Sequence, residues 1–185
     1  MTKSDDQRLL YDLRAGRPDA CGELVRKHYE AVYRFMVHLT RDVHRAEDLT
    51  QETFAAAWEN IAAFQGRSAL ATWLHRIAYT KFIDAQRLEQ RTIGLHERLA
   101  GSPVAGVDPI TIVLADDEAR HLNRILHDLD VPERTLLVLH YLQGLSYRDM
   151  ADVLGEPVGT VKWRTAEALK SLRALLGDEV PDHAS

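Results

Sequence analysis

Apolar residues recur at helical spacing along nearly the whole chain. Between residues 19 and 39, for example, Leu24, Val32 and Phe35 share one face of a 3.6-residue repeat. Short apolar runs that could form strands lie inside these longer helical patterns. The periodicity predicts helices at 5–14, 19–39, 43–62, 69–91, 110–128, 132–142, 147–154 and 158–176. We therefore expect an all-α fold.

Polar residues mark the expected starts of several helices. Asp42, Ser68 and Ser146 each precede a helical pattern, where a short polar side chain can accept a hydrogen bond from a backbone N–H group. Asp149 follows Ser146 by three residues, which indicates a loose capping box.

One long segment between the helices lacks periodicity. Residues 92–108 are rich in glycine and also contain serine and proline. We expect a flexible linker there, which would separate two small helical domains at residues 1–91 and 109–185.

The helices on either side of residue 65 differ in charge. Residues 41–60 hold five acidic side chains and two arginines, whereas residues 75–91 hold four basic and two acidic ones. An acidic surface suits a basic protein partner, and a basic surface with aromatic side chains suits a nucleic-acid strand. The opposite charges of the two helices therefore predict that this hairpin binds a protein complex with one helix and DNA with the other.

The composition narrows the class of protein. The net charge is -5, so DNA binding would need local basic patches and a larger partner that supplies phosphate contacts. No apolar run approaches the roughly 20 residues that cross a bilayer, and the N-terminus does not resemble a signal peptide. The single Cys21 fits a reducing compartment. We expect a cytoplasmic protein without membrane insertion.

The second half contains the pattern of a helix-turn-helix. A short helix, a glycine turn and a second helix follow one another, with Ala151 and Val161 at positions where the two helices would pack. Lys162, Trp163 and Arg164 occupy the first turns of the second helix, where a recognition helix reads base edges. A plain helical hairpin with a solvated charge cluster is the alternative.

These motifs carry a family resemblance. Residues 141–147 and 157–164 resemble the fourth conserved region of bacterial extracytoplasmic-function sigma factors, and residues 46–54 and 72–78 resemble the second. The two motifs occur in the family's order and span nearly the whole chain. The resemblance implies a subunit that joins core RNA polymerase, finds and opens promoters of a stress- or signal-responsive regulon, and has no enzymatic activity or cofactor.

The resemblance also implies three sets of contact residues. The helix that docks on the clamp of the largest polymerase subunit is matched by Asp48, Gln51, Glu52, Phe54 and Trp58. For Phe54 and Trp58, ordinary packing in the core is the alternative. The implied contacts to the minus-ten element, including a flipped base, are Phe64, Arg67, Ser68, Arg76, Tyr79, Thr80, Lys81, Asp84 and Arg87. The implied contacts to the minus-thirty-five element are Arg148, Thr160, Lys162, Trp163, Arg164 and Glu167. The family further implies contact with the flap of the second-largest subunit and an anti-sigma factor.

Three of these positions depart from the family's common pattern. Thr80 replaces a common asparagine, Trp163 a common serine, and Glu167 a common basic residue. Trp163 could stack on a sugar or contact a thymine methyl, and Glu167 could accept a hydrogen bond from cytosine. Alternatively, both face solvent or a partner. We expect promoter preferences that differ from the common ones.

Two other classes of protein compete with this interpretation. A helix-turn-helix regulator that binds DNA alone would explain the second half but not the charged hairpin. An enzyme or metal protein is suggested by Glu118 and His121, which have the spacing of a helical ligand pair. No second such pair is found, and His28, His38 and His140 lie within apolar patterns, so we expect no metal or cofactor.

Overall fold

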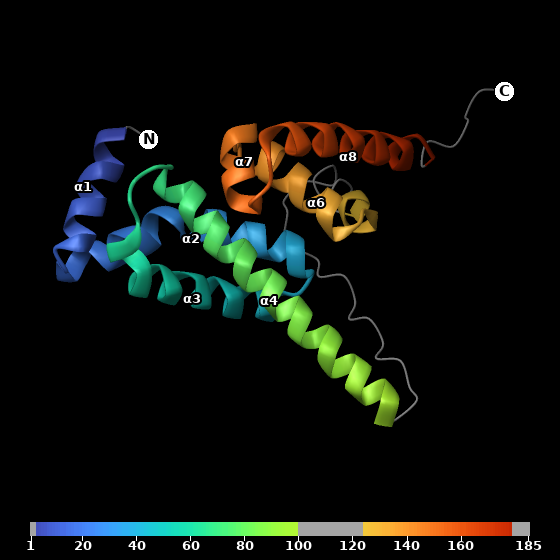
Figure 1. Ribbon diagram of the computed structural model, residues 1–185, viewed down its shortest axis with the longest axis horizontal. Helices are drawn as coiled ribbons and strands as arrows, with labels where there is room; N and C mark the ends of the chain where they lie inside the picture. Colours follow the sequence, from blue (N-terminus) through green and yellow to red (C-terminus); the bar gives the residue numbers. More distant parts are fainter. Residues whose placement is uncertain (1–2, 100–123, 179–185) are drawn as a thin grey trace. The chain divides into compact units, whose positions relative to one another are not determined.

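The computed structural model describes residues 3–99 and 124–178, with side chains over 6–92 and 124–176 (Figure 1). Every regular element within these ranges is helical, which confirms the all-α prediction. The chain divides into two compact units, Met1–Pro109 and Ile110–Ser185. Each is described by itself below.

Unit 1 is a bundle of helices around α2. The elements are α1 (Lys3–Arg14), α2 (Pro18–Thr40), α3 (Val43–Asn60), the 3-10 turn η1 (Ile61–Ala63) and α4 (Leu70–Leu99). Both α3 and α4 pack against α2 and against each other, and α1 packs on α2 (Figure 1). This arrangement leaves one long face of α3 and one of α4 in solvent.

The core of unit 1 comes from the apolar stripes that the sequence predicts. Phe35 of α2 is fully buried, as are Leu74 and Ala78 of α4. At the rim of this core, Tyr29 stacks on Tyr33 with ring centroids 5.8 Å apart. Both tyrosines therefore pack within the fold of unit 1.

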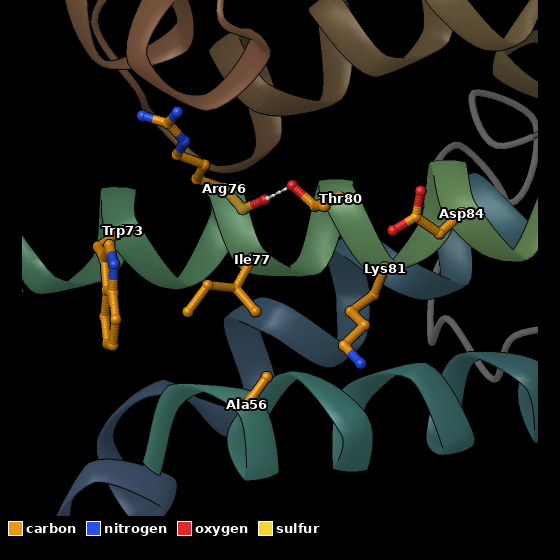
Figure 2. A pocket seen from close by; sticks show the side chains of 7 residues that line it. All are labelled: Ala56, Trp73, Arg76, Ile77, Thr80, Lys81 and Asp84. Carbon is orange, nitrogen blue, oxygen red and sulfur yellow. Dashed lines mark hydrogen bonds between the residues drawn. The ribbon is translucent and has the colours of Figure 1, made fainter. Parts of the chain in front are cut away.

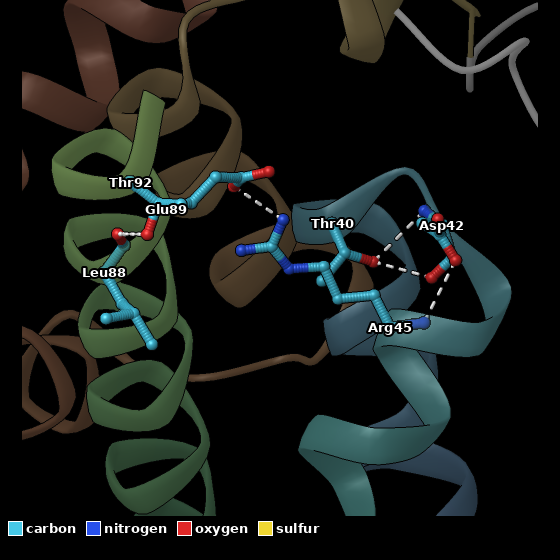
Figure 3. A network of polar contacts seen from close by, with 6 residues as sticks. All are labelled: Thr40, Asp42, Arg45, Leu88, Glu89 and Thr92. Atoms are coloured by element: carbon cyan, nitrogen blue, oxygen red, sulfur yellow. Dashed lines mark hydrogen bonds and ion pairs between the residues drawn. The ribbon is translucent and has the colours of Figure 1, made fainter. Parts of the chain in front are cut away.

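The start of α3 is fixed by local hydrogen bonds and one ion pair (Figure 3). The Asp42 carboxylate accepts from the Arg45 N–H group at 3.0 Å, so the predicted N-cap is confirmed. Thr40 Oγ1 donates to the Asp42 carbonyl at 2.9 Å. The Arg45 side chain reaches Glu89 Oε2 at 2.7 Å, which ties the start of α3 to the second half of α4.

Helix α4 differs from its prediction at both ends. The cap predicted at Ser68 is wrong, because α4 begins at Leu70 and its first helical bond runs from the Trp73 N–H group to the Ala69 carbonyl at 3.1 Å. The helix also passes the expected end at Arg91 and continues to Leu99. Residues 92–99 contain one glycine and no proline, and one glycine costs only about 1 kcal/mol in a helix.

Unit 2 contains α6 (Val131–Leu137), the π-helical turn η2 (Val138–Leu142), α7 (Tyr147–Leu154) and α8 (Val158–Asp178). Its core joins Leu126 and Leu129 to Leu137 of α6 and Ala168 of α8. The predicted helix 110–128 lies largely outside the described residues. Its last part, 124–128, is described and is helical.

The helix predicted at 132–142 is present, but only its first half is α-helical. In its second half the backbone widens into a π-turn, in which the Gln143 N–H group donates to the Val138 carbonyl at 2.9 Å. Gly144 follows with a left-handed φ of 68°, a conformation that glycine adopts without strain. The chain thereby turns toward α7.

Candidate protein and nucleic-acid interfaces

The solvent face of α3 carries the acidic residues that the sequence assigns to a protein partner. Asp48, Gln51 and Glu52 are exposed, because the opposite face of α3 is buried in unit 1. Trp58 lies further along the helix with 42% of its surface exposed. An exposed indole beside carboxylates suits a partner that offers both basic and apolar groups.

Phe54, which the sequence groups with these residues, is buried. Only 9% of its surface is exposed, and its ring stacks on Tyr29 at a centroid distance of 6.2 Å. Phe54 therefore packs α3 against α2 and does not belong to the exposed surface of α3. The signal was available in the sequence, because Phe54 falls on the same helical stripe as Thr50 and Ala57.

The loop from Phe64 to Ser68 is anchored at its first residue. The Phe64 side chain is 7% exposed and stacks on Trp73 at 4.7 Å, and its carbonyl accepts from the Arg14 guanidinium. Gly66 has a φ of 71°, which disfavours other residues. The loop therefore presents Arg67 to solvent, with Ser68 partly covered, while Phe64 faces inward.

A groove of about 270 Å³ lies between α3 and α4. Figure 2 shows the side chains of Ile77 and Lys81 extending toward α3, whereas those of Arg76 and Thr80, which also line the groove, extend away from α3. The groove is lined by Ala56, Trp73, Arg76, Ile77, Thr80, Lys81 and Asp84. It thus brings together four of the residues predicted at the minus-ten element.

Sequence reasoning missed the apolar members of this groove. Trp73 and Ile77 follow the apolar helical stripe of α4, which predicts burial, yet both are only partly buried and line the groove. The stripe is wider than the surface that α2 and α3 can cover, so its margin remains accessible. An aromatic wall beside polar groups is a surface on which an unpaired base can stack.

Two of the charged residues that line the groove, Lys81 and Asp84, form ion pairs. Lys81 Nζ lies 3.5 Å from Glu52 of α3, and Arg87 Nη1 lies 3.7 Å from Asp84. Thr80 Oγ1 donates to the Arg76 carbonyl at 2.9 Å. This bond uses the only proton of the hydroxyl, so Thr80 can offer a ligand acceptor lone pairs alone. The Tyr79 side chain is partly buried on the neighbouring face.

The helix-turn-helix predicted in unit 2 is present in α7 and α8. Ser146 caps α7, as predicted, by accepting from the Asp149 N–H group at 3.2 Å. The Asp149 carboxylate accepts from the Ser146 hydroxyl at 2.5 Å, whereas a full capping box would have it accept from the Ser146 backbone N–H group. Gly155 ends α7 with a φ of 69°. Ala151 and Val161 are buried between the helices, as the sequence predicts.

The first turns of α8 present several predicted contact residues. Thr160, Lys162 and Trp163 are exposed, with Trp163 at 65%, and Arg148 of α7 is exposed as well. Lys162 Nζ lies 5.9 Å from the centroid of the Tyr147 ring. This edge of unit 2 therefore offers cations and one large aromatic ring.

Two charged residues on α8 are engaged within the protein. Arg164 donates to the Glu156 carboxylate, and Glu167 accepts from Lys170 Nζ at 2.7 Å. Sequence reasoning missed Glu156, since it stands in a turn and nothing in its spacing relates it to Arg164.

Two family models match the chain. The model "Sigma-70 region 2" matches residues 24–92, and "Sigma-70, region 4" matches residues 120–172. The first match contains α3, the loop and the groove, and the second contains the helix-turn-helix. No helix among the described residues is long and apolar enough to cross a membrane.

Curated relatives match over nearly their whole lengths. The ECF RNA polymerase sigma factor SigC of Mycobacterium tuberculosis is 35% identical over 98% of this chain and 96% of that protein. The ECF RNA polymerase sigma factor SigW of Bacillus subtilis is 30% identical over 91% of this chain and 95% of its own.

Solved structures of similar fold include two complexes. CnrH, in complex with the cytosolic domain of CnrY, is 26% identical, with a TM-score of 0.70 over 95% of this chain and 99% of that one. The sigma factor RpoE of Bartonella quintana, in complex with the anti-sigma factor NepR, is 25% identical, with a TM-score of 0.66 over 97% of this chain and 100% of that one.

Proposed function

Because the chain belongs to the extracytoplasmic-function sigma factors of the sigma-70 family, we propose that its two units divide promoter recognition between them. Members of this family direct RNA polymerase in transcription initiation and are not themselves enzymes. Residues 1–91 would bind core polymerase and open the minus-ten element, and residues 109–185 would recognise the minus-thirty-five element.

The acidic face of α3 is the proposed contact with core polymerase. Asp48, Gln51, Glu52 and Trp58 would dock on the clamp of the largest subunit, where carboxylates need basic partners and the indole needs an apolar one. Phe54 supports this surface from below through its stacking on Tyr29.

The loop and the groove of α4 are the proposed minus-ten site. Arg67 would contact the displaced strand, and an unpaired base would stack on the accessible part of Trp73. Thr80 would accept from an exocyclic amino group, because its own proton is bonded to the Arg76 carbonyl. Buried Phe64 holds the loop in place, and the remaining proposed contacts are Ser68, Arg76, Tyr79, Lys81, Asp84 and Arg87.

The helix-turn-helix is the proposed minus-thirty-five site. Helix α8 would enter the major groove with Thr160, Lys162, Trp163 and Arg164, while Arg148 would contact a phosphate. Glu167 stays in the proposed set, although its bond to Lys170 must open before it can accept from cytosine.

Further partners are proposed by likeness to relatives. CnrH and RpoE were solved with CnrY and with the anti-sigma factor NepR, respectively. We propose that this protein is likewise held by an anti-sigma factor, acts in the cytoplasm on a signal-responsive regulon, and contacts the flap of the second-largest subunit when bound to core polymerase.

The observation that carries the proposal is the pairing of an acidic α3 face with a base-sized groove on α4 in one hairpin. The test is co-elution with core polymerase on a sizing column. Asp48→Asn with Glu52→Gln should weaken co-elution at least about ten-fold if each lost contact costs roughly 1 kcal/mol. Glu30→Gln with Glu23→Gln removes two acids from α2 and should leave co-elution unchanged. Equal co-elution of both double variants would contradict the docking surface.

A further inference from the structure

Glu156 lies in the turn between α7 and α8, where its carboxylate contacts the recognition helix. Nη1 of Arg164 donates to Oε1 of Glu156, and each side chain is 30% exposed. The pair is therefore half-sheltered at the edge of α8, next to the exposed Lys162 and Trp163.

The backbone of Glu156 is held in place. Its N–H group donates to the Ala151 carbonyl at 3.2 Å, and the N–H group of Gly155 donates to the same oxygen at 2.9 Å. Pro157 follows, whose ring fixes its own φ. The backbone that carries the Glu156 side chain is thus fixed at the end of α7.

The second carboxylate oxygen is also informative. Oε2 of Glu156 is buried and has no hydrogen-bond partner within the described residues. A guanidinium carries five N–H donors in one plane and often engages both oxygens of a carboxylate. Oε2 therefore offers Arg164 a second acceptor. Whether Arg164 contacts one carboxylate oxygen or both, its guanidinium is restricted, and the N–H groups that do not face Glu156 remain available to a ligand.

We propose that Glu156 is a positioning residue for recognition of the minus-thirty-five element: it holds Arg164 so that the outward N–H groups meet a guanine edge in the major groove. A fixed guanidinium loses less side-chain entropy on binding, and bidentate contact to guanine O6 and N7 demands a defined plane. The carboxylate also repels phosphates, so the pair favours selectivity over general affinity. The inference rests on the proposed role of Arg164.

The test measures base preference with the full chain bound to core polymerase. Each minus-thirty-five position of a promoter is randomised in turn, and transcription is compared for the wild type, Arg164→Ala, Glu156→Ala and both changes together. Asp152→Ala is the matched control, because it removes an exposed acid from α7, whereas the acidic partner of Arg164 is Glu156. Melting curves establish that each variant folds.

We expect Arg164→Ala to abolish the preference for guanine at one position. Glu156→Ala should reduce the same preference at least about five-fold, since a bidentate base contact discriminates by roughly that factor or more. The double variant should lose no more than Arg164→Ala, and Asp152→Ala should lose nothing. Should Glu156→Ala unfold, Glu156→Gln replaces it and should reduce that preference about two-fold.

Two results would overturn the inference. One is an unchanged preference in the Glu156 variant, and the other is a Glu156 effect of full size when Arg164 is already absent. A wild-type holoenzyme that shows no minus-thirty-five preference at any position would instead contradict the proposed function of unit 2, so the two failures are distinguishable.

Discussion

Glu52 of α3 and Lys81 of α4 form an ion pair, with 3.5 Å between Oε2 and Nζ. Glu52 belongs to the proposed polymerase-docking face, and Lys81 lines the groove proposed for the minus-ten strand. In the free protein the carboxylate therefore neutralises a cation that would otherwise attract phosphates. Polymerase that engages Glu52 would release Lys81 for DNA.

This relationship predicts opposite effects of one substitution. Glu52→Gln should increase the affinity of the free protein for a single-stranded minus-ten oligonucleotide by up to about five-fold, because an exposed ion pair is worth at most about 1 kcal/mol. The same change should weaken binding to core polymerase. Fluorescence anisotropy and co-elution measure the two effects.

The control for this prediction is Glu59→Gln, which removes an exposed acid from α3 without touching Lys81. If Glu59→Gln increases the affinity for the oligonucleotide as much as Glu52→Gln does, net charge explains the change and the specific role of the ion pair is wrong.

The cap at the start of α3 predicts a loss of stability. Asp42→Ala should lower the free energy of unfolding of unit 1 by about 1 kcal/mol, because the N–H group of Arg45 loses its acceptor. Asp42→Asn retains a side-chain oxygen and should cost less. Urea titration of the full chain checks both, and equal stability of Asp42→Ala and the wild type would show that the cap contributes nothing.

His28 predicts how the stability of unit 1 depends on pH. Burial lowers the pKa of His28, and nearby His75 and Lys27 lower it further, while the Asp6 carboxylate opposes them. The folded state therefore holds the imidazole neutral, whereas the unfolded chain takes up a proton near pH 6.5. As the pH falls below about 6.5, unfolding binds a proton and the free energy of unfolding decreases.

Replacement of His28 by leucine should flatten this dependence. Nε2 of His28 is buried without a hydrogen-bond partner in the described part of the chain, so an apolar side chain should be tolerated there. Denaturation midpoints at about pH 7.5 and 5.5 measure the slope. His44→Gln, at an exposed position of α3, should retain the wild-type slope. A His28→Leu slope equal to that of the wild type would assign the dependence to other groups.

Trp163 predicts a specific promoter preference. Its side chain on α8 is 65% exposed, so Trp163→Ser should change the free energy of unfolding by no more than about 0.5 kcal/mol. The selected minus-thirty-five sequence should shift toward the common family motif, because the large ring no longer contacts sugar or methyl groups. Selection from randomised promoters checks this, and identical motifs for both proteins would assign no recognition role to the indole.

The features that could be predicted from the sequence are those that depend on residues close together along the chain. The caps at Asp42 and Ser146 follow from local rules, and they are present. The predicted cap at Ser68 failed by one residue, since neighbouring positions compete to start a helix and sequence does not decide between them.

Features that depend on contacts between distant residues could not be predicted. Phe64 is buried because Trp73 stacks on it, and Glu52 meets Lys81 only because α3 and α4 pack together. The contact between Glu156 and Arg164 likewise requires the geometry of the turn. The π-turn in η2 was likewise not predictable from the spacing of apolar residues, which continues there as in an α-helix.

The central claim is that this chain directs core RNA polymerase to promoters that contain both elements. Run-off transcription tests it most directly, with core polymerase, DNA from upstream of the protein's own gene, and other promoter fragments of the same genome. We predict transcripts that require the protein, with shared sequences near minus ten and minus thirty-five of their start sites. The absence of such transcripts, together with failure to co-elute with core polymerase, would contradict the account.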